Sequence, residues 1–146
     1  MLLVVVIAAV IVLDQATKTW AENALADRTI HLVWTFRLNL SLNSGVAFGL
    51  GHGVTPVLVA AAVLVLVFTV GLSRALSSPV RAIAMGLVLG GALGNLADRV
   101  LRSNGGAVID FIDPQWWPIF NVADTAISCG VILLLISGFG QREQQA

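Results

Sequence analysis

The sequence predicts an all-α membrane bundle of four transmembrane helices that carries a small β-hairpin, folded as a single integral membrane domain over residues 1–146. Three observations carry this prediction: the composition, four long apolar runs, and one sustained alternation of apolar and polar residues. Of the 146 residues, 58% are hydrophobic and 11% are charged, and the mean hydropathy is +0.92. A soluble domain has about 25% charged residues, so this composition excludes a soluble monomer and a disordered chain.

Four apolar runs are each long enough to cross a bilayer, which takes roughly 20 residues of helix. The first run is apolar through Leu13 and can continue to about Trp20, and the second contains no charged residue. The third is interrupted by Arg81 and Asn95, and the fourth by Asp124. A helix satisfies its own backbone hydrogen bonds in lipid, so we expect helical spans at about residues 1–20, 54–72, 80–98 and 119–140.

The distribution of basic residues predicts that both termini are cytoplasmic. The short loop Ser73–Arg81 contains Arg74 and Arg81 and no acid, and the tail contains Arg142. The positive-inside rule places such segments in the cytoplasm. The opposite loops contain more basic residues, but these lie among acids and could serve a site: Lys18, Arg28, Arg37, Arg99 and Arg102.

Between the first two spans, at about residues 29–50, lies the one segment for which we expect β-structure. Apolar residues alternate with largely polar ones from Ile30 to Asn43, and this period of two predicts a strand with one buried and one wet face. Asn43, Ser44 and Gly45 supply turn-forming residues, after which residues 46–50 can return as a second strand. A hairpin is marginally stable alone, so we expect it to lie against the membrane surface or the helix ends.

Ionisable and amide side chains near the ends of the spans are the candidates for chemistry, because such groups are costly in a membrane and often functional. Asp14 and Lys18 stand four residues apart, a spacing suited to an ion pair that anchors the end of the first span. Asn95 and Asp98 end the third span, on a face that also carries two glycines and can approach another helix closely. The same Asn-x-x-Asp pattern opens the fourth span at Asn121–Asp124. The two tetrads should therefore lie at adjacent ends of antiparallel helices.

Three carboxylates, those of Asp98, Asp110 and Asp124, are expected to converge near one membrane face, with the cation of Arg99 among them. Two carboxylates held close cannot both ionise, so one keeps a proton. In an aspartyl hydrolase the ionised member takes a proton from water and the protonated member donates to the substrate carbonyl. The alternative is a buried Asp–Arg cluster that only holds the helices together. Spacing alone favours Asp98 as the partner of Asp124, because each of these two aspartates ends a copy of the Asn-x-x-Asp pattern.

Two functions of different classes fit these features: an intramembrane aspartyl endopeptidase, and a small four-helix transporter or proton relay that uses the Asp cluster. Transporter charges usually lie near the midplane between repeated halves, whereas these acids gather at one end, which favours the peptidase. Equal numbers of acidic and basic residues leave no basic field for nucleic acid. His31, His52 and Cys129 form no metal-ligand pattern, so we expect no metal and no cofactor.

Five ordered motifs resemble those of the lipoprotein signal peptidase (signal peptidase II) family. Each motif is short and unspecific by itself, but five in the family's order on a four-span scaffold make a specific pattern. The resemblance covers the chain from the first span to the fourth. The motifs lie at Asp14–Lys18, Asn43–Phe48, Gly94–Arg99, Val108–Phe111 and Phe120–Asp124.

The resemblance implies that Asp110 and Asp124 are the catalytic residues and that Asp98 is a supporting acid. It implies that Asp14 and Lys18 have a structural or orienting role. The remaining positions expected to bind substrate or support the site are Asn43, Gly45, Asn95, Arg99, Asn121 and Ala123.

The resemblance also implies where the protein works and on what. The hairpin corresponds to an extracytoplasmic β-cradle, with the active site toward the outer face of the bacterial cytoplasmic (inner) membrane. The substrate would be a prolipoprotein whose signal peptide is cut just before a diacylglyceryl-modified cysteine. The expected partners are this lipid-modified precursor and membrane lipid, with the enzyme acting as a monomer.

Overall fold

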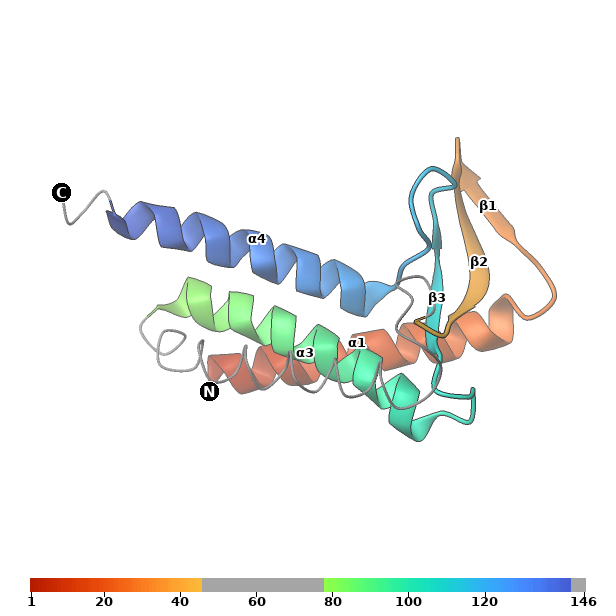
Figure 1. The fold of residues 1–146 in the computed structure, drawn as a ribbon, viewed down its shortest axis with the longest axis horizontal. Helices are drawn as coiled ribbons and strands as arrows, with labels where there is room; N and C mark the ends of the chain where they lie inside the picture. The colour runs from red at the N-terminus through yellow and green to blue at the C-terminus, as the bar shows by residue number, and fades with distance from the viewer. Residues whose placement is uncertain (46–77, 143–146) are drawn as a thin grey trace.

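The computed structural model describes residues 1–45 and 78–142, and in these the chain forms three helices and one three-stranded sheet (Figure 1). Helices form where three of the four predicted spans lie. The second predicted span, residues 54–72, and the returning strand expected at 46–50 lie outside the described residues. In chain order the elements are α1 (Leu2–Ala24), β1 (Ile30–Val33), β2 (Phe36–Asn43), α3 (Pro79–Leu101), β3 (Val108–Asp113) and α4 (Val122–Arg142).

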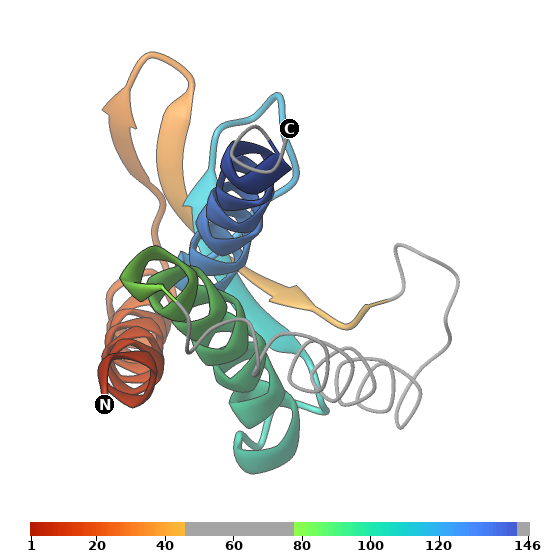
Figure 2. The same ribbon diagram turned by 90° about the vertical axis from the view of Figure 1, so that its left-hand side faces the viewer.

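The helices form a layer in which α3 lies between α1 and α4 and packs on both (Figures 1 and 2). By length and composition, α1 and α3 can each cross a membrane, and α4 contains a shorter apolar stretch, Val122–Ser137. Pro79 opens α3, where its missing N–H costs no helical hydrogen bond. Because α3 and α4 run antiparallel, the end of α3 lies beside the start of α4 (Figure 1). The two Asn-x-x-Asp tetrads are thus brought together as predicted.

Glycines on α3 allow the helices to pack this closely. A Cβ atom added to Gly90 would lie 2.8 Å from Val10 Cβ of α1, and one added to Gly94 would lie 2.6 Å from Asp14 Oδ2. Carbon atoms do not approach other atoms this closely without displacing them. The glycine-bearing face predicted near the end of the third span is therefore a contact between helices, as in other membrane bundles.

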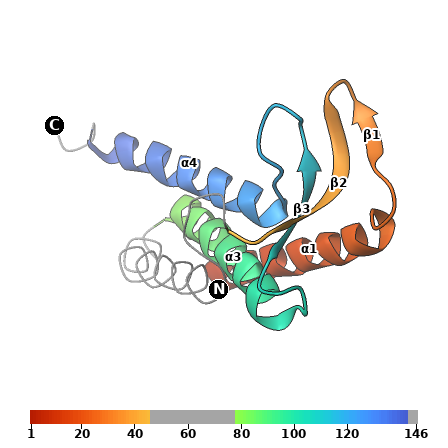
Figure 3. The same cartoon turned by 45° about the vertical axis from the view of Figure 1, so that its right-hand side comes forward.

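The sheet is antiparallel, in the order β1-β2-β3, and lies across the ends of the helices, remote from the start of α1 (Figures 1 and 3). The expectation that β-structure is confined to residues 29–50 is wrong, because Val108–Asp113 forms the third strand. It pairs with β2, with Leu42 opposite Ile109 and Leu38 opposite Ile112. A hairpin alone buries too little surface to be stable, and β3 supplies the missing neighbour.

The single strand expected from Ile30 to Asn43 is also wrong, because the chain reverses at Trp34 and Thr35 to form the β1–β2 hairpin. The apolar alternation continues through this reversal for a geometric reason. Ile30 pairs with Leu38, so even-numbered residues stay on one face of both strands, and a bulge between His31 and Val33 absorbs the extra residue. A turn that preserves the period of two leaves no trace in the pattern.

The core beneath the sheet is formed between β3 and the last turns of α1. Ala21 and Leu25 pack against Ile109 and Phe111, all of them buried. The Trp20 ring meets the Phe111 ring edge to face, with centroids 6.4 Å apart. This packing holds β3, and with it Asp110, at a fixed height on the helical layer.

Candidate active site

The start of α4 is organised by a reciprocal pair of hydrogen bonds between Asn121 and Asp124. The Asp124 N–H donates to Asn121 Oδ1 at 2.9 Å, and the Asn121 N–H donates to Asp124 Oδ2 at 3.2 Å. This is the capping-box arrangement, in which the residue before the helix and the residue three positions later satisfy each other's N–H groups. Asp124 is therefore held in one orientation at the helix N-terminus, where a negative charge is stabilised.

Asp110 lies on β3 with its side chain 2% exposed. Its Oδ1 accepts a 2.7 Å hydrogen bond from Asn121 Nδ2, and its Oδ2 accepts one of 3.0 Å from Asn43 Nδ2. Burial raises the pKa of Asp110 to about 6, and the negative charge of Asp124 acts in the same direction. The amide donors of Asn43 and Asn121 oppose this shift, because they favour the ionised form. Asp110 thus retains its proton at a pH where an ordinary aspartate has lost it.

Asn95, on α3, links the two sides of the site. Its Nδ2 donates to Asp124 Oδ1 at 2.8 Å, while its Oδ1 accepts from Asn121 Nδ2 at 3.1 Å and from Lys18 Nζ at 2.9 Å. Asn121 therefore contacts both Asp110 and Asp124, and Asn95 contacts both Asn121 and Asp124. The structure brings together the two aspartates implied by the motifs and the two asparagines expected beside them.

Asp98 is fully buried and is engaged in an ion cluster at the α1–α3 contact. Its Oδ2 lies 2.9 Å from Lys18 Nζ and accepts the Ile109 N–H at 3.1 Å. Its Oδ1 accepts from Gln15 Nε2 at 2.9 Å and lies 3.2 Å from Arg102 Nε. Both oxygens are thus taken up by cations and donors, which fits a supporting acid better than the partner for Asp124 that spacing alone suggested.

The first motif supplies the rest of this cluster. Asp14 and Lys18 form the expected ion pair, with 2.8 Å between Asp14 Oδ2 and Lys18 Nζ, and neither side chain is exposed. Asp14 Oδ1 accepts the Ala123 N–H of α4 at 2.9 Å. The pair therefore does more than anchor the end of α1, because it reaches both α3 and the first turn of α4.

Gly45 and Arg99 complete the set of predicted positions. The Gly45 N–H donates to Asn43 Oδ1 at 3.0 Å, and its φ of 77° favours glycine. This turn holds the Asn43 amide with its Nδ2 toward Asp110. Arg99 Nη1 donates to the Asn95 carbonyl at 3.3 Å, and the guanidinium interacts electrostatically with all three carboxylates, Asp124 most strongly. Among the described residues, the buried Nε of Arg99 has no hydrogen-bond partner.

Sequence reasoning predicted no specific contact for Gln15 or Arg102, which tie α1 to α3. Gln15 Nε2 donates to Asp98 Oδ1 and to the Gly94 carbonyl, and Arg102 contacts Asp98, Gln15 and Glu22. Arg102 stands four residues after Asp98, a spacing that predicts an ion pair on one helix face. That signal was present in the sequence, whereas the contacts made by Gln15 depend on how the helices pack.

A second ion pair missed by sequence reasoning closes the far end of the sheet. Arg37 Nε of β2 lies 2.6 Å from Asp113 Oδ2 at the end of β3. Burial opposes ionisation of Asp113, but the hydrogen bonds from Arg37 and from the Gln115 N–H outweigh it and lower the pKa of this carboxyl. This pair fixes the β2–β3 register beyond the site.

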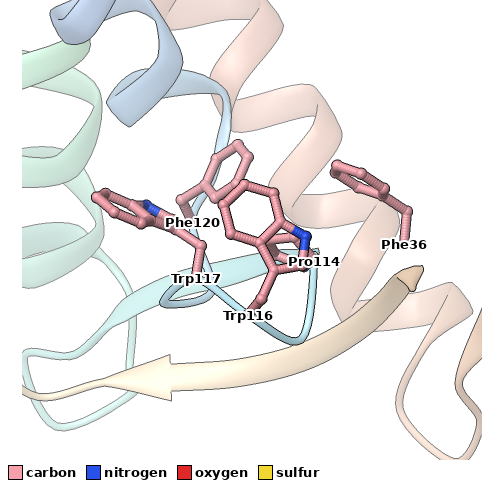
Figure 4. Close-up of a pocket in the computed structure, with 5 residues that line it drawn as sticks. All are labelled: Phe36, Pro114, Trp116, Trp117 and Phe120. Carbon is pink, nitrogen blue, oxygen red and sulfur yellow. The ribbon is translucent and has the colours of Figure 1, made fainter.

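An apolar pocket of about 350 Å³ opens beside the capping residue of α4 (Figure 4). Phe120, which lines it, immediately precedes Asn121, and its carbonyl accepts the Phe111 and Ile112 N–H groups at 3.1 and 2.9 Å. The pocket can receive an apolar group close to the polar site. Its lining is Phe36, Pro114, Trp116, Trp117 and Phe120.

Chemically, the site offers two rigidly held carboxylates, one with a raised pKa, at the end of an apolar helical layer. Such a pair can supply a general base and a general acid at once. This is the pattern expected of an aspartic hydrolase that meets its substrate at a membrane surface.

Comparisons with known proteins agree with this chemistry. The family model of signal peptidase (SPase) II matches residues 6–140. The chain is 44% identical to the lipoprotein signal peptidase of Rhodococcus jostii over 93% of its own length and 71% of the relative. It is 43% identical to that of Syntrophomonas wolfei over 93% of both chains.

Two solved structures with a similar fold are bacterial membrane enzymes. A bacterial membrane enzyme determined by the in meso method at 2.3 Å resolution superposes with a TM-score of 0.78 and 25% identity, covering 99% of this chain and 91% of that one. A second bacterial membrane enzyme, determined at 1.9 Å, gives a TM-score of 0.72 and 26% identity. With the family match over most of its length, the chain belongs to the signal peptidase II family.

Proposed function

We propose that Asp110 and Asp124 are the catalytic pair of this aspartic endopeptidase, which removes signal peptides from prolipoproteins. The observation that carries the assignment is their shared partner, Asn121, which donates to Asp110 through its side chain and to Asp124 through its backbone. The raised pKa of Asp110 supports it, since one member of a working pair must keep a proton. The engagement of Asp98 by Lys18 and Arg102 leaves Asp110 as the available partner.

The proposed reaction needs one water and no other reactant. Asp124 accepts N–H donors on both oxygens, which favours its ionised form and lets it take a proton from the water. The water oxygen bonds to the scissile carbonyl carbon while Asp110 gives its proton to the carbonyl oxygen. In the resulting tetrahedral diol, the C–N bond breaks, its electron pair goes to nitrogen with the proton from Asp124, and a hydroxyl proton returns to Asp110. The products are a carboxylic acid and an amine, and both aspartates regain their first states.

We propose that the remaining site residues act by holding this pair and the peptide. Asn43 and Asn121 orient Asp110, and Asn95 orients Asp124. Gly45 and Ala123 place Asn43 and the first turn of α4 through backbone hydrogen bonds. The Arg99 guanidinium, which has donors to spare beside the carboxylates, would bind a carbonyl of the substrate backbone.

We propose that the domain has four spans, with residues 54–72 as the second, in a bacterial inner membrane. The start of α1 and the far end of α4 lie at the end of the helical layer remote from the sheet (Figure 1). This fits two cytoplasmic termini with the site at the outer face, in agreement with the basic loop Ser73–Arg81. Labelling of single cysteines placed in loop 73–81 and at Trp34, with a membrane-impermeant reagent on intact cells, should modify only the latter.

We propose that the substrate is a precursor cut before a diacylglyceryl-modified cysteine, and that a monomer suffices for activity. The pocket beside Phe120 supports a lipid-bearing substrate, because it is apolar and Phe120 immediately precedes Asn121, the hydrogen-bond partner of both aspartates. Purified protein reconstituted in bilayers should cleave the lipid-modified precursor far faster than the unmodified one. Equal rates on the two precursors would contradict the proposed specificity while leaving the peptidase activity intact.

Substitution of the two aspartates tests the catalytic assignment. Asp110→Asn and Asp124→Asn should each abolish turnover, because an amide can neither take a proton from water nor act as a carboxylic acid. The double variant should be little worse than either single one, since members of one catalytic unit are not additive. Both single variants should still bind the lipid-modified precursor. Native turnover by a folded Asp110→Asn, with Asp98→Asn inactive, would transfer the assignment to Asp98 and Asp124.

A further inference from the structure

Lys18 is fully buried, and its Nζ lies within hydrogen-bond distance of three acceptors in the described residues, as many as an ammonium has hydrogens. Two are carboxylates, Asp14 Oδ2 at 2.8 Å and Asp98 Oδ2 at 2.9 Å. The third is neutral: Asn95 Oδ1, also at 2.9 Å. The two ion pairs alone would account for a structural cation, but the bond to Asn95 points the ammonium at the neighbour of a catalytic residue.

That third bond determines which way the Asn95 amide faces. An ammonium has donors and no acceptor, so only Oδ1 of the amide can face Lys18. Asn121 Nδ2 donates to the same oxygen at 3.1 Å. The NH₂ group is then left to face Asp124, and it donates to Oδ1 of that carboxylate at 2.8 Å. The opposite orientation would set donor against donor at Lys18 and oxygen against carboxylate at Asp124.

We propose that Lys18 is a positioning residue for the catalytic pair and acts through Asn95, by holding the amide so that its N–H reaches Asp124. The proposal rests on the assignment of Asp110 and Asp124 as the catalytic pair. It gives the first motif a role in the reaction beyond the α1–α3 ion pair.

The carboxylate partners of Lys18 reach the same two residues through the backbone. Asp14 Oδ1 accepts the N–H of Ala123, next to Asp124, at 2.9 Å. Asp98 Oδ2 accepts the N–H of Ile109, next to Asp110, at 3.1 Å. Loss of Lys18 therefore disturbs backbone placement as well, and a useful test must separate that general effect from the orientation of one amide.

The distinguishing readout is the acidic limb of the pH–rate profile. Within the described residues, the titratable and charged groups that act on the catalytic pair or on its charged neighbours are Asp110 on β3, Arg99 and Asp98 on α3, and Lys18 and Asp14 on α1. Of these, Lys18 is the one that controls a hydrogen bond to Asp124 through Asn95. If the amide turns its oxygen toward the carboxylate, protonated Asp124 is favoured, and the base is lost at a higher pH.

The experiment compares Lys18→Met with Arg102→Met in the full chain, reconstituted in bilayers with a lipid-modified precursor. Both variants remove a cation that pairs with Asp98, but Lys18 also donates to Asn95 Oδ1, whereas the other side-chain bonds of Arg102 in the described residues go to Glu22, Gln15 and Thr19. We expect Lys18→Met to lower kcat about 10- to 100-fold, the range for lost positioning contacts, with KM changed by no more than roughly twofold. Its acidic limb should move to higher pH, whereas that of Arg102→Met should not move. Equal losses with unmoved limbs in both variants would overturn the proposal.

A double-mutant cycle with Asn95→Ala tests whether Lys18 acts through the amide. In the Asn95→Ala background, Lys18→Met should add no more than roughly twofold to the loss in kcat, because the group it orients is gone. Multiplicative losses would show an independent role and overturn the proposal. If Lys18→Met does not fold, the charge-neutral Asp14→Asn/Lys18→Met variant takes its place, compared with Asp14→Asn. Failure of that variant to fold would make Lys18 a folding residue and also overturn the proposal.

The catalytic assignment is tested separately in the same assay by Asp110→Asn and Asp124→Asn. If both are inactive and Lys18→Met shows no shifted limb, the positioning role fails and the catalytic pair stands. If Asp110→Asn turns over normally, the catalytic pair itself is wrong.

Discussion

Lys18 Nζ and Asp98 Oδ2 form an ion pair of 2.9 Å in which neither side chain has any exposed surface. A charge buried to this degree depends on its partner, because separating the two leaves an uncompensated ion in a medium of low dielectric constant. Asp98 is thus bound to the α1–α3 contact, although it lies in the same Asn-x-x-Asp pattern as Asp124. The pair engages Asp98 in the contact between the helices, which leaves Asp110 and Asp124 for the proposed reaction.

Breaking this pair should cost stability more than chemistry. We expect Asp98→Asn to lower the free energy of unfolding by about 3–5 kcal/mol, the usual cost of removing one member of a buried pair. Turnover by the folded fraction should persist. Chemical unfolding in detergent and a cleavage assay at matched folded concentration measure the two effects.

Arg37→Leu provides the matched control, because it breaks an ion pair whose arginine is 34% exposed. Solvent screens such a pair, so we expect a loss of about 0–1 kcal/mol. A stable Asp98→Asn without activity would contradict the supporting role of Asp98.

The pH dependence of kcat/KM should show a decline above about pH 6. In the proposed reaction Asp110 must carry the proton that it donates, and its pKa of about 6 means that this proton is lost as the pH rises through that value. Asn43→Ala removes a donor that favours the ionised form, so the decline should shift to higher pH as overall activity falls. The measurement is the pH profile between pH 4.5 and 8.5. A shift of the decline to lower pH in Asn43→Ala would contradict the assignment of Asp110 as the proton donor.

Folding stability should also depend on Asp110, with a sign set by its raised pKa. The folded state holds this proton up to about pH 6, whereas the unfolded chain releases it near 3.8. Between these values the folded state binds more protons, so stability falls as the pH rises. With 1.36 kcal/mol per pKa unit, the group costs on the order of 3 kcal/mol above pH 6.

We therefore expect Asp110→Asn to be more stable than the wild type at pH 8, with the difference shrinking toward pH 4. Unfolding temperatures at the two pH values measure it. Asp113→Asn serves as the opposite case, because the pKa of Asp113 is lowered. Its ionised form stabilises the fold at neutral pH, so this variant should be less stable than the wild type at pH 8. Equal behaviour of the two variants would contradict the prediction.

Close packing of α3 on α4 should be needed to place Asp124. A Cβ atom on Gly91 would collide with the Ala123 carbonyl oxygen and would lie 2.8 Å from Ile127 Cγ1. A backbone oxygen cannot move aside alone, so Gly91→Ala should displace the first turn of α4. We expect a loss of about 1–3 kcal/mol in stability, typical of overpacking.

The activity of Gly91→Ala should fall about 10-fold or more, since small misplacement of a reacting group is costly. Leu93→Ala is the control, because Leu93 lies on the outer side of α3 and is 37% exposed. It should retain activity close to that of the wild type. Native activity in Gly91→Ala would show that the first turn of α4 can move without harm.

Hydrolysis should continue in excess chelator. The carboxylate oxygens of Asp110 and Asp124 accept N–H donors from asparagines, and amide N–H groups are not metal ligands. The activation of water is thus assigned to a carboxylate. Loss of turnover with EDTA and its recovery on adding a divalent ion would contradict the aspartyl mechanism.

The hairpin and the third strand show how much of the sheet could be predicted from patterns along the chain. Alternation from Ile30 to Asn43 predicted extended structure with the even-numbered side inward, and Ile30, Leu38 and Leu40 do pack against the core. The reversal at Trp34 was invisible because the bulged pairing keeps the same period on both strands. Val108–Asp113 also alternates, but over six residues only, and it becomes a strand by pairing with β2. A strand's existence depends on a neighbour that the local pattern does not contain.

The sequence by itself determined the class of protein, the positions of the apolar segments and the side chains from which a site could be built. These follow from composition and from the periods of helix and strand, which report which residues share a face within one element. Only the tertiary structure decided which partners each of the three acids meets. Asp110 meets Asn43 and Asn121, and Asp98 meets Lys18 and Gln15, across long separations in the chain. Such contacts depend on the packing of helices and on the sheet that lies across their ends, which no period along a single segment encodes.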